Sequence, residues 1–302
     1  MCWDRSTPRS DAYNELNDLL EDVLDGTNRN MTSISPLVEA LKKSKQAITT
    51  DKVSKAMEEL KQYWDELGLN HFEQVMDYTS CLLLYCEQLP HPEKSYTVVA
   101  AEFSHYLAID KFLLADDNSV VDRINEKYLG FLSRYLGEKE IEYYKHCFKT
   151  WVSTCHEEAV LKVSLPKMPI PVARYSMWAD WRWVNIGMAP YMRMILMINF
   201  PDEDLHSAIA QSSIMYISMQ TALLNDIASV IKDKGSNEVN YYLQVAPDTV
   251  EKLEDILEKS NEYLETVVLS NNLKHVLKSA LHGSYLMYSL SKRYFGKTEP
   301  NW

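Results

Sequence analysis

The chain contains few glycines and few cysteines, and each shortage excludes a class of protein. Only 8 of the 302 residues are glycine, and neither GxGxxG nor GxxxxGK[ST] occurs, which argues against Rossmann and P-loop nucleotide sites. The 5 cysteines are odd in number, widely spaced and without a CxxC pair. This pattern argues against a disulfide framework or a zinc knuckle and predicts reduced, mostly buried thiols in a cytosolic protein.

Positive charge is also scarce. The chain has 31 Lys and Arg against 43 Asp and Glu, a formal net charge of -12. Nucleic acid is therefore not expected as the main partner, because phosphate backbones bind to clustered cations. A polyanionic ligand would need local cations, or metal ions held by the protein's own carboxylates.

No apolar run is long enough for a membrane span. The longest, "MRMILMINF", is much shorter than the ~20 residues that a spanning helix requires. The N-terminal "MCWDRSTPRSDAYNEL" lacks the apolar region of a signal peptide. We expect a soluble, cytoplasmic protein with no membrane span.

Helical periodicity dominates the chain. Hydrophobic residues make up 46% and aromatic residues 11% of it, enough for a buried core and the walls of an apolar cavity. Apolar residues recur at helical spacing in 11–24, 51–67, 96–117, 138–162, 204–234 and 273–296, and Asp51 is the expected N-cap of the second. No alternating strand pattern, repeat or Gly/Ser linker appears. The sequence predicts one all-α domain over 1–302 with roughly a dozen helices, and flexible ends at about 1–12 and 297–302.

Three polar residues stand in a column on the helix predicted over 204–234. In "LLNDIASVIKD", Asn225, Ser229 and Asp233 are four residues apart and so share one helix face. An amide oxygen, a hydroxyl and a carboxylate are hard ligands suited to Mg²⁺, which often completes its shell with water and phosphate oxygens. Such a column also occurs on solvated helix faces, so spacing alone leaves both interpretations open.

Cationic and phenolic groups suited to phosphate occur at two further places. Lys232 adjoins Asp233, and "SKRY" near the C-terminus carries Arg293 and Tyr294. A guanidinium offers paired N–H donors to phosphate oxygens and a phenol adds another. A basic helix end that interacts with the helix dipole explains Arg293 equally well.

Arg182 lies among three tryptophans in "DWRWVNIG" and the residues just before it. It either stacks on these rings as part of the structure or points into a pocket.

Carboxylates follow the apolar helix predicted over 96–117. Asp110 comes after "HYLAI", where an unpaired carboxylate would be costly, so it either pairs with a cation or binds metal. Asp117 returns to nearly the same face, while Asp116 points away. Asp116 and Asp117 are equally well explained as the polar end of this helix.

Together these residues resemble the class I terpene synthases. "NDIASVIKD" is similar to the second metal motif of that family, (N/D)Dxx(S/T)xxx(E/D), with Asn225, Ser229 and Asp233 at the ligand positions. "SKRY" is similar to the family's terminal Arg-Tyr pair, and "DWRWVNIG" resembles the broken central helix that carries a diphosphate-sensing Arg, here Arg182. The sequences and spacing of these motifs are most similar to those of the trichodiene-synthase-like branch of sesquiterpene synthases.

One motif departs from this family. The first metal motif is usually DDxxD, and no such string occurs. Asp110 is similar in position to its first Asp, but Lys111 stands where the second is expected. The absence of a second Asp-rich motif argues against a prenyl-chain-elongating synthase.

The resemblance implies a class I bundle around a central apolar cavity that ionises a linear isoprenyl diphosphate. Farnesyl diphosphate is the expected substrate, with cyclisation to a sesquiterpene and release of diphosphate. Mg²⁺, three ions with Mn²⁺ as a substitute, would be held by Asp110 on one side and by Asn225, Ser229 and Asp233 on the other. Arg182, Lys232, Arg293 and Tyr294 would complete the anion site.

Aromatic faces stabilise carbocations, and seven residues are candidates for lining the cavity. They are Tyr78, Phe103, Tyr106, Trp151, Trp178, Tyr216 and Tyr285. Two alternatives stay open, a diphosphate-binding relative with lost or altered turnover and a non-enzymatic helical interaction protein. A homodimer is compatible with the resemblance.

Overall fold

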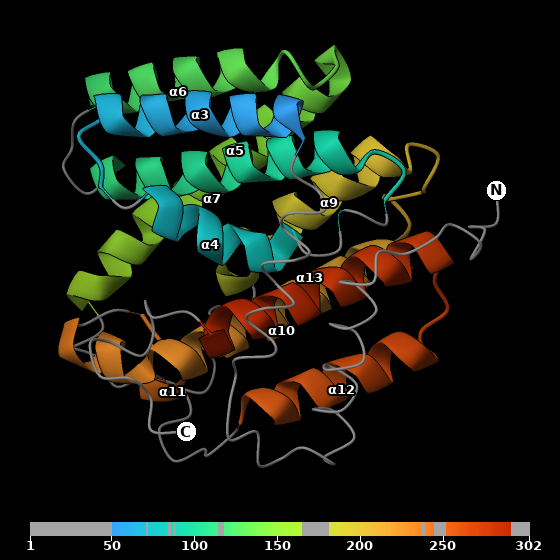
Figure 1. Ribbon diagram of the computed structural model, residues 1–302. Coiled ribbons are helices and arrows are strands. Elements are labelled where there is room, and N and C mark those ends of the chain that lie inside the picture. Colours follow the sequence, from blue (N-terminus) through green and yellow to red (C-terminus); the bar gives the residue numbers. More distant parts are fainter. Residues whose placement is uncertain are drawn as a thin grey trace.

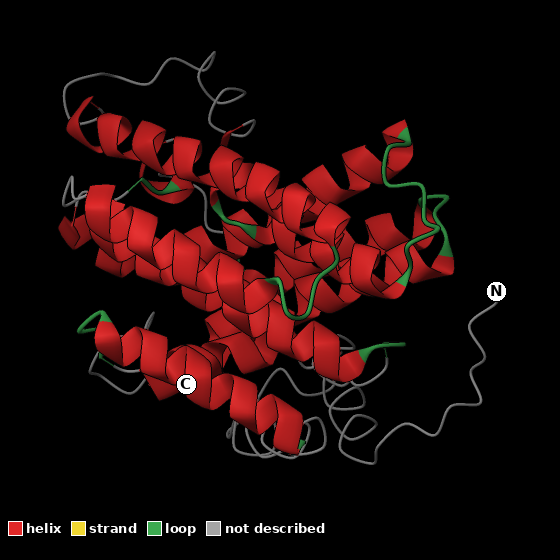
Figure 2. Cartoon of the chain, turned by 90° about the horizontal axis from the view of Figure 1, so that it is seen from above, coloured by secondary structure: helices red, strands yellow, loops and turns green. Residues whose placement is uncertain are grey.

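The computed structural model describes residues 50–70, 72–83, 86, 89–113, 118–164, 181–236, 239–244 and 252–290. Within these ranges the chain forms helices and no strands (Figure 2). The helices are α3 (Asp51–Glu66), α4 (Phe72–Leu83), α5 (Pro92–Leu113), α6 (Asn118–Leu132), α7 (Glu138–Ser164), α9 (Met188–Asn199), α10 (Ala208–Ser236), α11 (Tyr241–Gln244), α12 (Leu253–Thr266) and α13 (Asn271–Leu290). The predicted all-α fold is confirmed for the described residues. The boundary of 1–302 as a single domain stays a prediction.

The helices pack in layers around one hydrophobic core (Figure 1). Helices α3 and α6 form an outer layer, α4, α5, α7 and α9 lie beneath it, and α10 and α13 follow, with α12 on the far side. Helix α3 begins differently from the expectation, because Thr50 and not Asp51 is its N-cap. The Thr50 hydroxyl accepts the Val53 N–H at 3.4 Å, so Asp51 becomes the first helical residue.

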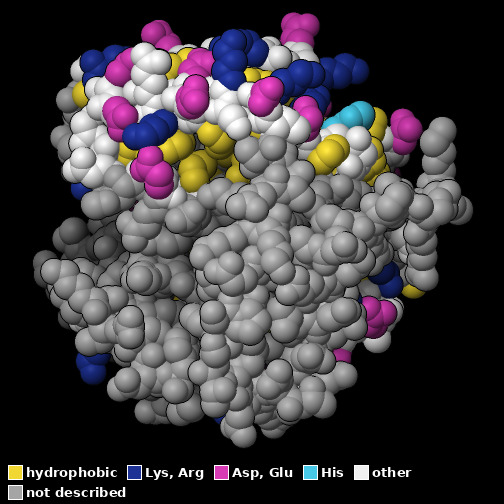
Figure 3. Space-filling view, in the orientation of Figure 1, with side chains coloured by type: hydrophobic (Ala, Val, Ile, Leu, Met, Phe, Trp, Pro, Cys, Tyr) yellow, Lys and Arg dark blue, Asp and Glu magenta, His cyan; other side chains and the backbone are white. Residues whose placement is uncertain are grey.

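The outer surface of α3 and α6 carries charges of both signs. Figure 3 shows Lys and Arg side chains interspersed with Asp and Glu on this part of the molecule. One ion pair joins α6 to α3, Lys127 with Glu66, and another joins the turn after α6 to α3, Arg134 with Glu59. A surface that mixes charges of both signs favours solubility. On this face, Lys and Arg are not clustered into the positive patch that nucleic acid binding requires. Separately, no helix in the described part of the chain combines the length and apolar character needed to cross a bilayer.

Helix α5 is central and contacts α3, α4, α6, α7 and α9. It is buried on nearly all sides, so its polar residues need partners within the protein. The fully buried His105 meets this requirement, because its Nε2 donates to Asn125 Oδ1 at 2.9 Å and its Nδ1 accepts the Tyr144 hydroxyl at 2.6 Å. Burial lowers the pKa of His105 to about 3, which keeps the ring neutral.

Helix α9 runs antiparallel to both α5 and α10, and this fixes which ends of the helices meet. At one end of α9, Asn199 Nδ2 donates to Ser95 Oγ at 2.8 Å, and at the other Gly187 lies against Tyr106. Arg193 likewise binds Gln211 near the start of α10. The segment that precedes α9 therefore meets the C-terminal end of α5 and the C-terminal half of α10 at one end of the bundle.

A helix break at Gly187 separates residues 181–185 from α9. Gly187 has φ of 79°, a left-handed conformation that favours glycine, and a Cβ placed there would lie 3.2 Å from the Tyr106 ring. Tyr106 stacks on Trp151, with 4.4 Å between ring centroids and 6° between planes. Trp151 Nε1 donates to the Asn185 carbonyl at 3.0 Å, which satisfies a backbone acceptor that the break frees. Pro190 then lies in the first turn of α9, where no N–H is needed.

Glu102 is a buried acid at the packed centre of α5. Its side chain is 2% exposed, and neither carboxyl oxygen has a hydrogen-bond partner. The Tyr106 hydroxyl lies near the Glu102 carboxyl group and acts to lower its pKa, but the two groups do not form a hydrogen bond of normal geometry. Burial raises the pKa of Glu102 from 4.5 to about 8, so the group is neutral at pH 7.

Substitution of Gly187 by alanine should destabilise the fold. Gly187→Ala forces a side chain into a left-handed residue and against the stacked Tyr106, at an expected cost of about 1–3 kcal/mol. Gly130→Ala is the matched control, because nothing lies within 4 Å of the added Cβ. On an exposed helix this control should stabilise by up to ~1 kcal/mol. Urea unfolding of both variants measures the difference, and equal effects would contradict the assignment of strain to Gly187.

The free energy of unfolding should fall as the pH rises from the unfolded-state pKa of Glu102 to its folded-state pKa. Between the unfolded pKa of 4.5 and the folded pKa of about 8, the folded protein keeps a proton that the unfolded chain has released. Wild type should therefore lose up to about 4 kcal/mol relative to Glu102→Gln between about pH 5 and pH 8. Denaturant unfolding at a series of pH values measures this gap. Glu58→Gln, on the outer layer helix α3, is the control, and a gap independent of pH would contradict a neutral buried Glu102.

Candidate functional site

The three residues of the predicted metal column share one face of α10. Ser229 and Asp233 are buried and Asn225 is half-buried. The Ser229 hydroxyl donates a hydrogen bond to Asp233 Oδ2. Helical spacing places the three groups in register, and this bond brings the hydroxyl and carboxylate oxygens into contact.

The connection after α10 folds back onto this column. Asn240 is fully buried, and its Nδ2 donates to Asp233 Oδ2 at 2.9 Å and to Ser229 Oγ at 3.3 Å. The same nitrogen donates to the Asp226 carbonyl at 2.7 Å. A residue separated from the motif by a loop thus supplies the hydrogen bonds around its oxygens.

Arg182 reaches the column from the segment before the helix break. Its Nη2 donates to Asp226 Oδ1 at 2.7 Å and to Asn225 Oδ1 at 3.1 Å. Only 8% of the Arg182 side chain and none of the Asp226 side chain is exposed. A cation therefore lies directly beside the first residue of the column.

The electrostatics of this pair follow from burial and contact. Burial alone would lower the pKa of Arg182, but the carboxylates of Asp226 and Glu158 outweigh it and raise that pKa. Burial raises the pKa of Asp226, and the Arg182 contact opposes the shift. Since a guanidinium does not release its proton in proteins and the bond is short, we treat the pair as ionised.

A further contact links Arg182 to α7. Arg182 Nη1 donates to Asn185 Oδ1, and Asn185 Nδ2 donates to Glu158 Oε2 at 3.0 Å. Arg182 Nε is buried without a partner. Buried N–H groups normally have a hydrogen-bond partner within the protein. An unpartnered N–H at this position is therefore available to an anionic ligand.

Asp110 lies in the last turn of α5 and is exposed. The antiparallel packing of α9 against α5 and α10 places this turn at the same end of the bundle as Arg182 and Asn225. Lys111 is also in that turn and also exposed. The structure thus places Asp110 at the site's end of the bundle and identifies no second acid beside it on α5. Asp116 and Asp117 lie outside the described residues.

The aromatic candidates divide into separate groups. Tyr106 and Trp151 are buried and stacked beneath the helix break, and Phe103 is partly buried against the core. Tyr216 packs on Tyr263 of α12, with ring centroids 4.3 Å apart. The Tyr285 hydroxyl donates to Glu254 of α12 at 3.2 Å. Contacts with α12 therefore account for part of the surfaces of Tyr216 and Tyr285.

Several predicted residues lie outside the described part of the structure. They are Arg293, Tyr294 and Trp178, together with the side chains of Lys232 and Tyr78. Their roles stay predictions.

The sequence patterns did not reveal three residues of this network, Asp226, Asn185 and Asn240. Asp226 could have been found, because it stands inside the metal motif and a buried Asp beside an Arg-bearing segment suggests a pair. Asn185 is only three residues from Arg182, but its second partner Glu158 is 27 residues away, and the side-chain partners of Asn240 are 7 and 11 residues away.

The donor set fits a hard divalent cation. The hydroxyl of Ser229 and the carboxylate of Asp233 are in contact, the amide of Asn225 lies one turn earlier on the same face, and Asn240 hydrogen-bonds the first two, as is usual for metal ligands. Among the described residues no group of three or more His, Cys, Asp or Glu side chains could hold a metal. The described side chains would supply little negative charge to a cation at this position. Such a cation favours additional anionic oxygens from a bound substrate or other small molecule.

The chain matches a protein-family model over more than half of its length. The model described as "Terpene synthase family 2, C-terminal metal binding" matches residues 70–247, more than half of the chain, and this range includes Asp110, Arg182 and the whole column on α10. A comparison with curated proteins gave no significant match. The resemblance to class I terpene synthases is thereby confirmed, and the chain belongs to the metal-binding terpene synthase family.

Proposed function

We propose that the protein is a Mg²⁺-dependent sesquiterpene synthase of the trichodiene-synthase-like branch. It would ionise farnesyl diphosphate, cyclise the resulting carbocation and release diphosphate. The observation that carries this proposal is the contact between the Asn225–Ser229–Asp233 column and the buried Arg182–Asp226 pair. Metal-ligand oxygens and a guanidinium with an unpartnered N–H lie side by side, as binding of a metal diphosphate requires.

The residues would share the work of ionisation. Asn225, Ser229 and Asp233 would hold Mg²⁺ from the α10 side and Asp110 from the α5 side, with three ions as the expected number. The bound metal supplies positive charge that stabilises diphosphate as a leaving group. Arg182 would add guanidinium donors to the diphosphate oxygens, and Lys232, Arg293 and Tyr294 are proposed to complete the anion site.

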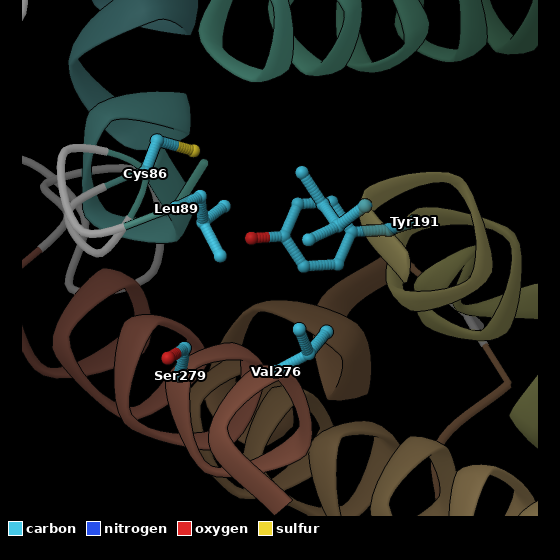
Figure 4. A pocket seen from close by; sticks show the side chains of 6 residues that line it. Cys86, Leu89, Tyr191, Val276 and Ser279 are labelled. Atoms are coloured by element: carbon cyan, nitrogen blue, oxygen red, sulfur yellow. The ribbon is translucent and has the colours of Figure 1, made fainter. Parts of the chain in front are cut away.

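The apolar interior beneath this end would hold the hydrocarbon chain. A cavity of about 10 Å³, which has room for about one water molecule and not for an isoprenyl chain, lies between α9, α13 and the segment that follows α4 (Figure 4). It is lined by Cys86, Leu89, Tyr191, Ile195, Val276 and Ser279. The hydrocarbon would therefore pack against the apolar core around the site and not in this small cavity, and apolar walls offer few groups that could quench a carbocation. The Tyr106–Trp151 stack provides aromatic faces that stabilise cations.

One observation favours a second candidate function, a diphosphate-binding relative with altered turnover. Lys111 stands beside Asp110 where this family commonly has a second acid. A cation there lowers the affinity of the α5 side for metal, although it would attract diphosphate. In either function we expect a cytoplasmic protein, with a homodimer as the proposed assembly.

Loss of the first column residue should abolish product formation. Purified protein is incubated with farnesyl, geranyl or geranylgeranyl diphosphate, with Mg²⁺ or with EDTA, and the extract is analysed by gas chromatography–mass spectrometry. We expect a cyclic product from farnesyl diphosphate that requires Mg²⁺ and decreases about 100-fold or more in Asn225→Ala. Asn272→Ala is the matched control, because this half-buried Asn bonds Glu203 at 2.9 Å at the other end of α9. A product formed equally in EDTA would contradict the proposal.

The contribution of α5 is tested by Asp110→Asn, which removes the charge and preserves the shape of the side chain. We expect a 10- to 100-fold rise, on the order seen for weakened metal sites, in the Mg²⁺ concentration needed for half-maximal turnover. Asp122→Asn, at an exposed position of α6, should leave this value unchanged. An unchanged Mg²⁺ dependence in Asp110→Asn would show that the α5 side takes no part, and would favour the second candidate function.

A further inference from the structure

Asn240 makes several hydrogen bonds around the column, although it stands outside the metal motif. Its Nδ2 carries two hydrogens and lies within hydrogen-bond distance of three oxygens, the Asp226 carbonyl at 2.7 Å, Asp233 Oδ2 at 2.9 Å and Ser229 Oγ at 3.3 Å, so one hydrogen is shared between two of them. Its Oδ1 accepts the Tyr242 N–H at 3.0 Å, which caps the short helix α11. The side chain is fully buried, so these bonds form away from solvent.

The donors of Asn240 constrain the two oxygens that are proposed to bind metal. A serine hydroxyl has one hydrogen and two lone pairs. In Ser229 the hydrogen goes to Asp233 and one lone pair accepts from Asn240, which leaves the second lone pair in a fixed direction. The carboxylate of Asp233 is held by two donors at the same oxygen, Oδ2. Both side chains are thus fixed in rotamers that bring their oxygens together.

Tyr241, the next residue in the chain, makes a similar contact with the Arg182–Asp226 pair. The Tyr241 backbone N–H donates to Asp226 Oδ2 at 2.9 Å, while the other oxygen of Asp226 accepts from Arg182. Two consecutive residues therefore support the two halves of the site, Asn240 the column and Tyr241 the partner of Arg182. The turn between α10 and α11 makes both contacts at once.

We propose that Asn240 is a positioning residue of the metal site, which holds Ser229 and Asp233 in the geometry that binds a divalent cation. The inference rests on the proposed function of the column and adds to it a residue from outside the motif. Groups that hydrogen-bond to metal ligands commonly change metal affinity by 10- to 100-fold when they are removed, on the order expected here. The competing explanation is that Asn240 serves only to cap α11 and fill the core.

The experiment measures metal binding directly, without turnover. Mn²⁺ is titrated into wild type and variants in the presence of pyrophosphate, and free Mn²⁺ is followed by electron paramagnetic resonance. We expect Asn240→Ala to bind Mn²⁺ roughly 10- to 100-fold more weakly than wild type. Asn199→Ala is the control, because this buried Asn also makes three hydrogen bonds, to His91, Ser95 and Ile195, at the far end of α9. Its Mn²⁺ affinity should equal that of wild type, even where its melting temperature falls.

A second variant separates positioning from capping. Serine is a good N-cap residue, so Asn240→Ser preserves a cap for α11 but lacks the amide donors. Under our proposal it binds Mn²⁺ as weakly as Asn240→Ala, while its melting temperature lies above that of Asn240→Ala because the cap of α11 is kept. Wild-type affinity in Asn240→Ser would overturn the proposal and leave Asn240 as a cap.

Asn225→Ala in the same titration separates this inference from the proposed function. Weak binding in Asn225→Ala combined with wild-type binding in both Asn240 variants would overturn the role of Asn240 alone. No Mn²⁺ binding by wild type, or wild-type binding in Asn225→Ala, would overturn the metal column and with it the inference.

Discussion

The buried ion pair between Arg182 and Asp226 is the interaction on which the site depends. Each partner alone would be a costly buried charge, since removal of one member of such a pair typically costs about 3–5 kcal/mol. The pair connects two segments 44 residues apart, the short helical segment before the break at Gly187 and the helix α10. Because Asn225 accepts from the same guanidinium nitrogen, the pair also sets where the metal column begins relative to the cation.

A buried ion pair is weak evidence for stability, because well-packed apolar residues often stabilise as much. Its retention here is better explained by what surrounds it. Asp226 uses both oxygens, one for Arg182 and one for the Tyr241 N–H, whereas Arg182 keeps a buried Nε without a partner. The anion is thus fully engaged and the cation is not. An arriving diphosphate would therefore find a donor that is already desolvated and already held in place by Asp226.

The sequence predicted those features that depend on local spacing and failed for those that depend on distant contacts. The helices and the column on α10 follow from a period of 3.6 residues, so the amino-acid pattern alone places Asn225, Ser229 and Asp233 on one face. The N-cap of α3 was wrong by one residue, because Thr50 and Asp51 are both acceptable caps and only backbone geometry decides. Glu102 stands in an apolar helix on which every face is covered by a different neighbour, and no local pattern reveals that.

The two halves of the site are specified by different physical rules, which explains why one half was easier to predict. The column lies on an uninterrupted helix, where backbone hydrogen bonds alone fix its spacing. Arg182 stands before a break whose geometry depends on Gly187 at positive φ, the ring of Tyr106 and the indole of Trp151, which come from three parts of the chain. Any change that shifts this stack moves the guanidinium relative to the column without altering any of the proposed metal ligands. In the proposed function, the distance between the guanidinium and the metal site, on which stabilisation of the leaving diphosphate would depend, is therefore set by aromatic packing at the break.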